Sequence, residues 1–385
     1  MQLRADWNYP TSVRFGPGRI AELAAAVQAA GIARPLLVTD PNLARLPMVA
    51  DALASLRAAD VSTELFSDIR PNPVESNITA GVAAFRAGGH DGVIAFGGGS
   101  ALDAGKLIAF MTAQSRPIWD FEDVGDWWTR ANSDGIAPVV AVPTTAGTGS
   151  EVGRAAVVTN VATHTKKIIF HPRMMPKITI CDPELTVGMP PAITAGTGMD
   201  ALAHCLEAYC GAYYHPLSDG IAAEGVRLVK ENLARAVNDG SDLESRAHMM
   251  AAAAMGATAF QKGLGAIHAL SHPVGALYDT HHGMTNGVFM PYVLLFNRAI
   301  IEDRIKRLAA YIGLRSTFRA FLDWMLALRA EIGMPHTLAE LKVGDEQIDR
   351  IVAMAVEDPT AGGNPRPFNK RAARTVFKRA LEGRL

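Results

Sequence analysis

Short runs of apolar residues alternate with amphipathic stretches through the first half of the chain. The apolar runs predict strands at 35–40, 62–68, 91–96 and 137–145, with additional strands, expected to be antiparallel, at 166–170 and 177–181. Helical periods are predicted between them, at 19–30, 49–59, 78–87 and 102–111. Continuous apolar strands are typical of a parallel sheet that helices cover on both faces.

The pattern changes after residue 186. Long helical periods rich in Ala, Leu and Met follow, and we predict no strand there. The expected helices lie at 194–210, 217–236, 242–261, 264–278, 286–297, 300–312, 316–333 and 369–382. The sequence therefore predicts an α/β domain over residues 1–189 and an all-helical domain over residues 190–385.

Composition narrows the class of protein. Of 385 residues, 49% are hydrophobic and 19% charged, and 37 basic residues balance 38 acidic ones. This balance excludes intrinsic disorder and offers no charged surface for nucleic acid or an anionic membrane. The first ten residues carry no signal-peptide pattern, the longest apolar stretch is too short to span a bilayer, and the three cysteines form no CxxC motif. We expect a soluble cytoplasmic enzyme without a membrane or nucleic-acid partner.

A run of small residues, Gly97-Gly98-Gly99-Ser100, lies between a predicted strand and a predicted helix. Glycines let the backbone approach a phosphate, and the N-terminus of the following helix offers free N–H groups. The run is not GxGxxG, so a tight turn without a ligand explains it about as well when it is taken alone.

Two further strand ends favour a nucleotide. The segment PTTAGTGSE (143–151) follows the next buried strand and is dense in Gly and hydroxyl groups. Asp40 ends an earlier strand, where a carboxylate can accept a hydrogen bond from a ribose 2′-OH and repel a 2′-phosphate. A turn role in Asp-Pro-Asn remains an equal alternative for Asp40. Together these features predict a Rossmann-like crevice that binds NAD rather than NADP.

Acidic and histidine residues recur at helical spacing in the second half. Asp200 and His204 are four residues apart, His268 and His272 repeat that spacing, and His282 follows. One Asp with three His is a plausible set of ligands for Zn²⁺ or Fe²⁺. A simple contact on one helix face also explains Asp200 with His204, but the clustering of the later histidines favours a metal.

The sequence resembles the iron-containing (group III) alcohol dehydrogenase family over nearly its whole length. The motifs that carry the resemblance are FGPGRI (15–20), GGGSxxD (97–103), PTTAGTGSE (143–151), DPEL (182–185), TGMDALAHCLEAY (197–209), HALSHPVGALYDTHHG (268–283) and NPRP (364–367). The resemblance implies a dehydroquinate synthase-like fold, with nucleotide and metal facing each other across the cleft between two domains, and a homodimer or larger homo-oligomer.

The resemblance also implies residue roles. The implied metal ligands are Asp200, His204, His268 and His282, with His272 as a proton relay near the nicotinamide. The implied cofactor contacts are Asp40, Asn72, Gly97, Gly98, Gly99, Ser100, Asp103, Thr144, Thr145, Thr148, Lys166 and Leu185. The chain departs from the family pattern at His281, where proline is more frequent, and at Gly153.

This reading predicts a metal-dependent, NAD-linked oxidoreductase that interconverts a short primary alcohol and its aldehyde. The metal, Fe²⁺ or Zn²⁺, would act as a Lewis acid on the alcohol. Arg154 and Lys262 are charges near the cofactor and metal motifs, and they suit a substrate with a carboxylate, phosphonate or sulfonate tail. Their local motifs also resemble the 4-hydroxybutyrate dehydrogenase branch of the family, which implies a short ω-hydroxy acid such as 4-hydroxybutyrate, or its semialdehyde, as the substrate. The alternative is that Arg154 pairs with Glu151 and that Lys262 lies on the surface.

Three other functions stay open on the same fold. A dehydroquinate synthase-like lyase would need a cluster of basic residues for a phosphate, and residues 190–290 are poor in these. A maleylacetate reductase-like enzyme would need no metal, so the complete set of ligands argues against it. A non-catalytic nucleotide-binding regulator would need a segment that binds a partner, and we find none in the sequence.

Overall fold

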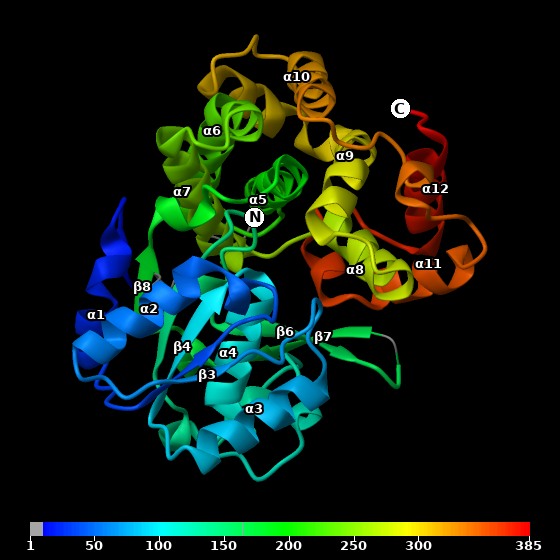
Figure 1. The fold of residues 1–385 in the computed structure, drawn as a ribbon. Helices are drawn as coiled ribbons and strands as arrows, with labels where there is room; N and C mark the ends of the chain where they lie inside the picture. The colour runs from blue at the N-terminus through cyan, green and yellow to red at the C-terminus, as the bar shows by residue number, and fades with distance from the viewer. Residues whose placement is uncertain (1–10, 164) are drawn as a thin grey trace. The chain divides into compact units, whose positions relative to one another are not determined.

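The computed structural model describes residues 11–163 and 165–385 and divides them into two compact units. The α/β unit contains residues 11–145 and Gly149–Thr186, and the helical unit contains Ala146–Thr148 and Val187–Leu385 (Figure 1). The expectation for the first ten residues lies outside the described residues. The predicted class, a parallel α/β fold followed by an all-helical fold, is confirmed.

The α/β unit is built on a six-stranded parallel sheet in the order β1-β8-β5-β4-β2-β3. Its strands are β1 Ser12–Phe15, β2 Pro35–Val38, β3 Glu64–Phe66, β4 Gly92–Gly97, β5 Val139–Pro143 and β8 Ile178–Cys181. Its helices are α1 Leu23–Ala29, α2 Pro47–Ala58, α3 Glu75–Ala87 and α4 Gly99–Met111.

Side chains alternate between two cores, one on each face of the sheet. Leu37 and Ile94 pack with α1 and α2, whereas their neighbours Leu36 and Val93 pack with α3 and α4. Period-two alternation sends successive side chains to opposite faces, so both faces of β2 and β4 must be apolar. This is why these strands are continuous apolar runs in the sequence.

The expectation for the last two strands was half right. β7 (Thr165–Phe170) pairs antiparallel with β6 (Ala155–Asn160) in a separate two-stranded sheet. β8 instead lies parallel between β1 and β5 inside the main sheet, so an antiparallel strand at 177–181 was wrong. β1 and β6 were not predicted: β1 is largely exposed and carries no continuous apolar run, and the apolar run of β6 is only four residues long.

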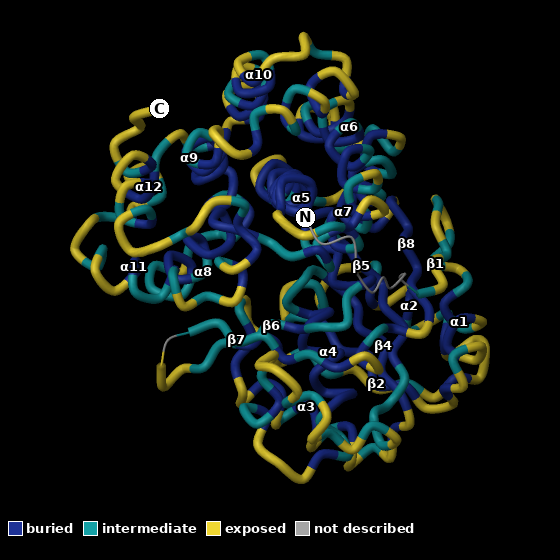
Figure 2. Tube along the Cα trace, turned by 180° about the vertical axis from the view of Figure 1, so that it is seen from behind, coloured by how far each residue is buried: buried dark blue, intermediate teal, exposed yellow. Residues whose placement is uncertain are grey.

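The helical unit contains eight α-helices among its described residues. They are α5 Pro191–Cys210, α6 Pro216–Asn238, α7 Leu243–Ala259, α8 Ala266–Tyr278, α9 His282–Tyr311, α10 Phe318–Glu331, α11 Ile348–Glu357 and α12 Lys370–Glu382. Figure 2 shows α5 buried over most of its length, beyond its first turn, and it contacts α6, α7 and α9. Within the described residues, no helix is long and apolar enough to cross a membrane.

Two expectations in this unit were wrong. The segments predicted as separate helices at 286–297 and 300–312 form the single helix α9, since no glycine or proline interrupts the chain between them. Helix α11 was not predicted, although Ile351, Val352 and Ala355 form its buried side.

Candidate metal and cofactor sites

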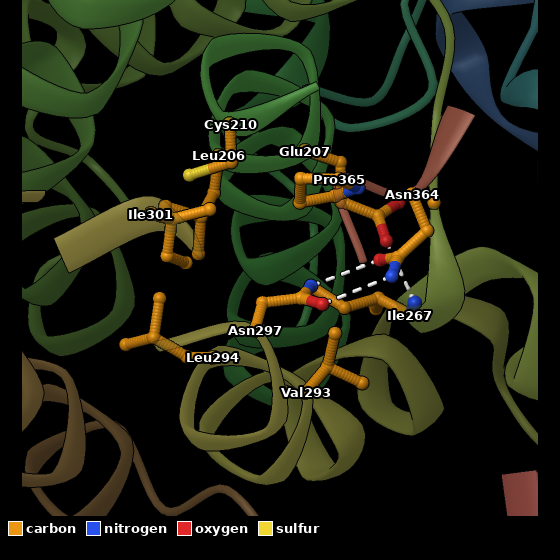
Figure 3. Close-up of a pocket in the computed structure, with 11 residues that line it drawn as sticks. Leu206, Glu207, Cys210, Ile267, Val293, Leu294, Asn297, Ile301, Asn364 and Pro365 are labelled. Atoms are coloured by element: carbon orange, nitrogen blue, oxygen red, sulfur yellow. Dashed lines mark hydrogen bonds between the residues drawn. The ribbon is translucent and has the colours of Figure 1, made fainter. Parts of the chain in front are cut away.

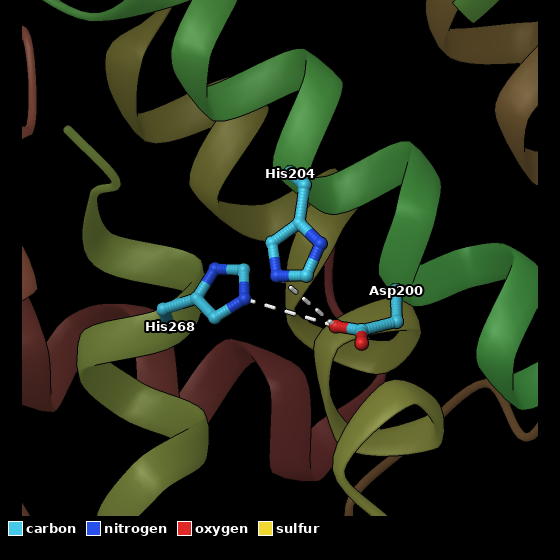
Figure 4. A group of neighbouring side chains, drawn as sticks. All are labelled: Asp200, His204 and His268. Carbon is cyan, nitrogen blue, oxygen red and sulfur yellow. Dashed lines mark ion pairs between the residues drawn. The ribbon is translucent and has the colours of Figure 1, made fainter. Parts of the chain in front are cut away.

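Four side chains of the helical unit converge on one point. Helix α5 carries Asp200 and His204 one turn apart, α8 carries His268, and His282 is the first residue of α9. Atom Nε2 of each histidine lies 3.7 Å from the same oxygen, Oδ1 of Asp200. Figure 4 shows His204 and His268 turned toward that carboxylate.

This spacing fits a divalent ion. A tetrahedral ion with bonds of ~2.0–2.2 Å holds its ligand atoms about 3.4 Å apart, close to the separations seen here. The amide nitrogen of Asn286 lies 2.8 Å from Asp200 Oδ1 and 3.2 Å from Nε2 of both His268 and His282. The side chain of His282 is 28% exposed and that of Asp200 only 5%, so the cluster is reached from the His282 side.

The electrostatics of the cluster favour a bound cation. Burial opposes ionisation of Asp200, but the nearby histidines hold its pKa far below its usual range. Burial lowers the pKa of His204 to about 4, whereas the hydrogen bonds that His268 donates to Asp200 and Glu207 overcome burial and raise the pKa of His268 to about 9. An ionised carboxylate among two buried imidazoles and a third, partly exposed one is a site where a metal ion can take the place of protons.

A second carboxylate fixes the ring of His268. One oxygen of Glu207 accepts a hydrogen bond from His268 Nδ1 at 2.6 Å, and the other accepts one from the backbone N–H of Ile267 at 2.6 Å. With Nδ1 donating, Nε2 is left as the metal-facing nitrogen. We did not predict Glu207 in this role, although it follows His204 by three residues on the same helix.

A small cavity lies beside Glu207, between α5, α8 and α9 (Figure 3). Its polar wall is a pair of amides, Asn297 and Asn364, that exchange two hydrogen bonds of 2.9 Å. Asn364, from the NPRP motif, also accepts a hydrogen bond from the backbone N–H of Ala266. These contacts fix the start of α8 and hence the position of His268.

His272 and His281 lie beside the cluster without joining it. The His272 ring stacks on that of His282, with centroids 5.4 Å apart and an angle of 15° between the planes. Its Nδ1 lies 2.8 Å from Oδ2 of Asp358, another residue the sequence did not single out. His281 precedes α9 and accepts a hydrogen bond from the backbone N–H of Met284.

In the α/β unit, the glycine run forms the turn between β4 and α4. Gly97 has φ +145°, and a Cβ there would lie 2.8 Å from Cβ of Ala101, so only glycine fits. Gly98 precedes the first turn of α4 and lies against Thr145. The backbone N–H of Thr144 bonds to the carbonyl of Gly97 at 3.0 Å. Four of the predicted cofactor residues therefore meet at the carboxyl ends of β4 and β5.

The remaining predicted cofactor residues are more scattered. Asp40 uses Oδ1 to accept the N–H groups of Asn42 and Leu43, so it has the turn role given as its alternative. Asn72 has a left-handed backbone, with φ 51°. Gly99 and Ser100 open α4, Lys166 lies in β7, Leu185 is buried, and Thr148 belongs to the helical unit.

Asp103 serves the interior of the α/β unit. Its carboxylate accepts hydrogen bonds from the Ser150 hydroxyl at 2.5 Å and from the backbone N–H of Val157 at 2.9 Å. The buried ammonium of Lys106 donates to the carbonyls of Ser150 and Ala155. These two side chains of α4 hold the end of the PTTAGTGSE loop and the strand β6 that follows it, and both of Asp103's oxygens are engaged there.

The alternatives for the two candidate substrate residues were wrong. In the described part of the chain no ion pair joins Arg154 to Glu151. Arg154 lies over the ring of Phe170, and burial raises the pKa of Glu151 to about 7. Lys262 is buried rather than on the surface, with its ammonium 2.5 Å from Oδ1 of Asp219.

Comparison with known proteins covers both units. The model of the iron-containing alcohol dehydrogenase family matches residues 10–183, and that of the C-terminal domain of Fe-containing alcohol dehydrogenases matches residues 194–381. A 4-hydroxybutyrate dehydrogenase of Cupriavidus necator is 36% identical, over 97% of this chain and 98% of the relative. An NAD-dependent methanol dehydrogenase of Bacillus methanolicus is 33% identical, over 97% and 98%. The crystal structure of a 1,3-propanediol oxidoreductase matches with a TM-score of 0.93 at 34% identity, over 98% of this chain and 99% of the other.

Proposed function

The chain belongs to the iron-containing alcohol dehydrogenase family, and from that premise we propose that it is a metal-dependent, NAD-linked enzyme interconverting a short primary alcohol and its aldehyde. The observation that carries this proposal is the convergence of three histidine Nε2 atoms at 3.7 Å from Asp200 Oδ1. It favours a metal-using dehydrogenase over a metal-free reductase on the same fold.

In this proposal the helical unit holds the metal through Asp200, His204, His268 and His282. When bound, a divalent metal supplies a Lewis acid for the alcohol or aldehyde oxygen, and NAD supplies the hydride acceptor. Glu207 and Asn286 orient the ligands, and His272 accepts or returns the proton of the alcohol.

The cofactor role of the α/β unit is proposed from its sheet edge. The turn at Gly97 and Gly98 presents the N-terminus of α4, where backbone N–H groups can bind a pyrophosphate. Thr144 and Thr145 lie beside this turn and can supply hydroxyl donors. The free carboxylate oxygen of Asp40 can accept a hydrogen bond from the adenosine ribose, which favours NAD over NADP.

For the substrate we propose an ω-hydroxy acid, such as 4-hydroxybutyrate, and its semialdehyde. The support rests on Arg154, whose guanidinium carries no carboxylate partner among the ion pairs of the described residues. Lys262 supports the proposal less, because its ammonium is already paired with Asp219, a carboxylate that it shares with Arg304. A short diol without a carboxylate is the second candidate, since a close structural relative is a 1,3-propanediol oxidoreductase.

We further propose that the enzyme works in the cytoplasm as a homodimer or larger homo-oligomer. The described cysteines, Cys181, Cys205 and Cys210, are all buried free thiols, as expected for a reducing compartment. Light scattering of the purified protein measures the oligomeric state directly, and a monomer would contradict this part of the proposal.

The function is tested by following NADH absorbance at 340 nm with anaerobically purified protein. Separate samples receive Fe²⁺ or Zn²⁺, together with a panel of short alcohols, diols and ω-hydroxy acids. We expect NADH formation that requires the metal and falls at least about a thousandfold in His268→Ala. His248→Ala, on α7, is the matched control and should keep wild-type activity. Absence of turnover with every metal and substrate would contradict the proposal.

A further inference from the structure

The carboxylate of Asp358 is nearly buried and lies within hydrogen-bond distance of His272. It follows α11 and opens the short helix η11 (Pro359–Gly363), and its side chain is only 9% exposed. Oδ1 accepts the backbone N–H and the hydroxyl of Thr360, at 2.9 and 2.6 Å. Oδ2 lies 2.8 Å from Nδ1 of His272. Both oxygens of Asp358 are thus engaged. Of the two partner residues, Thr360 and His272, only His272 can take up a proton.

These contacts determine which nitrogen of His272 carries hydrogen. Burial alone would raise the pKa of Asp358, but the charge and hydrogen bond of His272 and the hydrogen bonds of Thr360 bring it below its usual value. Asp358 is therefore ionised at neutral pH, and an ionised carboxylate only accepts hydrogen bonds. Nδ1 of His272 must therefore be the donor whether the ring is charged or neutral, and in the neutral ring the lone pair lies on Nε2.

The same arrangement occurs twice on α8. His268 and His272 lie one turn apart, and each gives its Nδ1 to a carboxylate from another element, Glu207 on α5 and Asp358 before η11. Nε2 of His268 faces Asp200 in the donor set. The ring of His272 lies beside the proposed metal ligands. Its centroid is 5.8 Å from that of the His268 ring, and it stacks on the ring of His282. In both histidines Nδ1 donates to a carboxylate, which leaves Nε2 of His268 to bind a metal and Nε2 of His272 to accept a proton.

We propose that Asp358 is a positioning residue that holds His272 as the Nδ1–H tautomer, so that Nε2 accepts the proton of the alcohol. This inference rests on the proposed function. During oxidation Nε2 of His272 would take the O–H proton, bound NAD would accept the hydride with the electron pair of the C–H bond, and the C–O bond would become the carbonyl. The reverse reaction returns the proton from Nε2.

Kinetics of the Zn²⁺-loaded enzyme test the coupling between the two residues. We expect Asp358→Asn to lower kcat about 10- to 100-fold with KM within about twofold, because the amide permits the wrong tautomer. His272→Ala should lose a similar factor, and the double variant should lose no more than either one. Asp349→Asn, an exposed position on α11, is the matched control and should be silent. Losses that multiply in the double variant would overturn the proposal.

Metal affinity separates positioning of the proton acceptor from damage to the metal site. Titration of metal-free protein with Zn²⁺ should give the same affinity for Asp358→Asn as for wild type, whereas Glu207→Gln should bind about 10- to 100-fold more weakly. An equal loss of affinity in Asp358→Asn would overturn the proposal. If that variant fails to fold, Thr360→Val, which removes one donor to Asp358, should lower kcat in the same direction by a smaller factor.

The tautomer itself can be read without turnover. In ¹⁵N-histidine-labelled, Zn²⁺-loaded protein, the signal that disappears in His272→Ala should show hydrogen on Nδ1 in the wild type and on Nε2 in Asp358→Asn. Hydrogen on Nε2 in the wild type would overturn the proposal. Because this spectrum needs no substrate, it distinguishes a wrong assignment of Asp358 from a failure of the proposed dehydrogenase function.

Discussion

The sites proposed in the two units are built in opposite ways. In the helical unit, side chains from α5, α8 and α9 converge, and the chemistry depends on which residue types lie there. In the α/β unit, the turn at Gly97 offers backbone groups, and the chemistry depends on the absence of a side chain. A site built of side chains is lost when a ligand residue is replaced, whereas a site built of backbone is lost when a Cβ enters it.

The variant with the largest expected effect is Gly97→Ala, which tests whether the turn between β4 and α4 binds the cofactor through its backbone. A Cβ would meet Ala101 at 2.8 Å on a backbone with φ +145°, so we expect about 2–4 kcal/mol of destabilisation and NAD binding weakened roughly a hundredfold. Denaturant unfolding and fluorescence titration with NADH measure the two effects. Gly220→Ala, a helical glycine with open space around it, is the control. Wild-type NADH affinity in Gly97→Ala would contradict a cofactor site at this turn.

The complementary change in the helical unit is Glu207→Gln. The amide keeps the size of the side chain but weakens the hydrogen bond that orients His268, so Zn²⁺ affinity should fall about 10- to 100-fold. NADH affinity, assigned to the other unit, should stay at the wild-type value. A loss of NADH affinity in this variant, with metal affinity unchanged, would reverse the assignment of the two units.

The pH dependence of stability tests the buried carboxyl group of Glu151, at the end of the PTTAGTGSE loop. Burial raises the pKa of Glu151 to about 7 from its ordinary value of 4.5, so the folded state keeps a proton that the unfolded chain releases. Stability should therefore fall as the pH rises from about 4.5 to 7, by roughly 1–3 kcal/mol, and Glu151→Gln should remove this slope. Denaturant unfolding between pH 5 and 7.5 measures it, with the exposed Glu184→Gln as control. An unchanged slope in Glu151→Gln would show that another group causes it.

The smallest expected effect concerns substrate choice. Arg154→Ala should raise KM for 4-hydroxybutyrate roughly tenfold, because a guanidinium–carboxylate contact is lost, and leave KM for 1,3-propanediol unchanged. Arg173→Ala, at an exposed ion pair with Asp134, is the matched control. Equal effects of Arg154→Ala on both substrates would exclude a role in recognising the carboxylate.

The sequence predicts a site built of side chains more readily than one built of backbone groups. The period of four places Asp200 and His204 on one helix face, so local spacing is enough to suggest a side-chain site. Apolar runs likewise located β2, β4 and β5. The glycine run suggested a backbone site only weakly, since glycines also form turns without ligands.

The features that the sequence could not predict depend on distant partners. Asp358 meets His272 across 86 positions, and no local pattern marks that contact. The burial of Lys262 depends on Asp219, which lies on another helix. The place of β8 inside the parallel sheet is set by its neighbours β1 and β5, which its own residues do not specify.

The most direct test of the proposed metal site is to titrate chelator-treated protein with metal. Metal binding and NADH formation are both measured at each step. We predict that about one equivalent of Zn²⁺ or Fe²⁺ per chain binds and restores turnover in proportion, and that His268→Ala shows neither effect while its NADH affinity stays unchanged. Full turnover in the metal-free protein, or in His268→Ala, would contradict a metal site at Asp200, His204, His268 and His282.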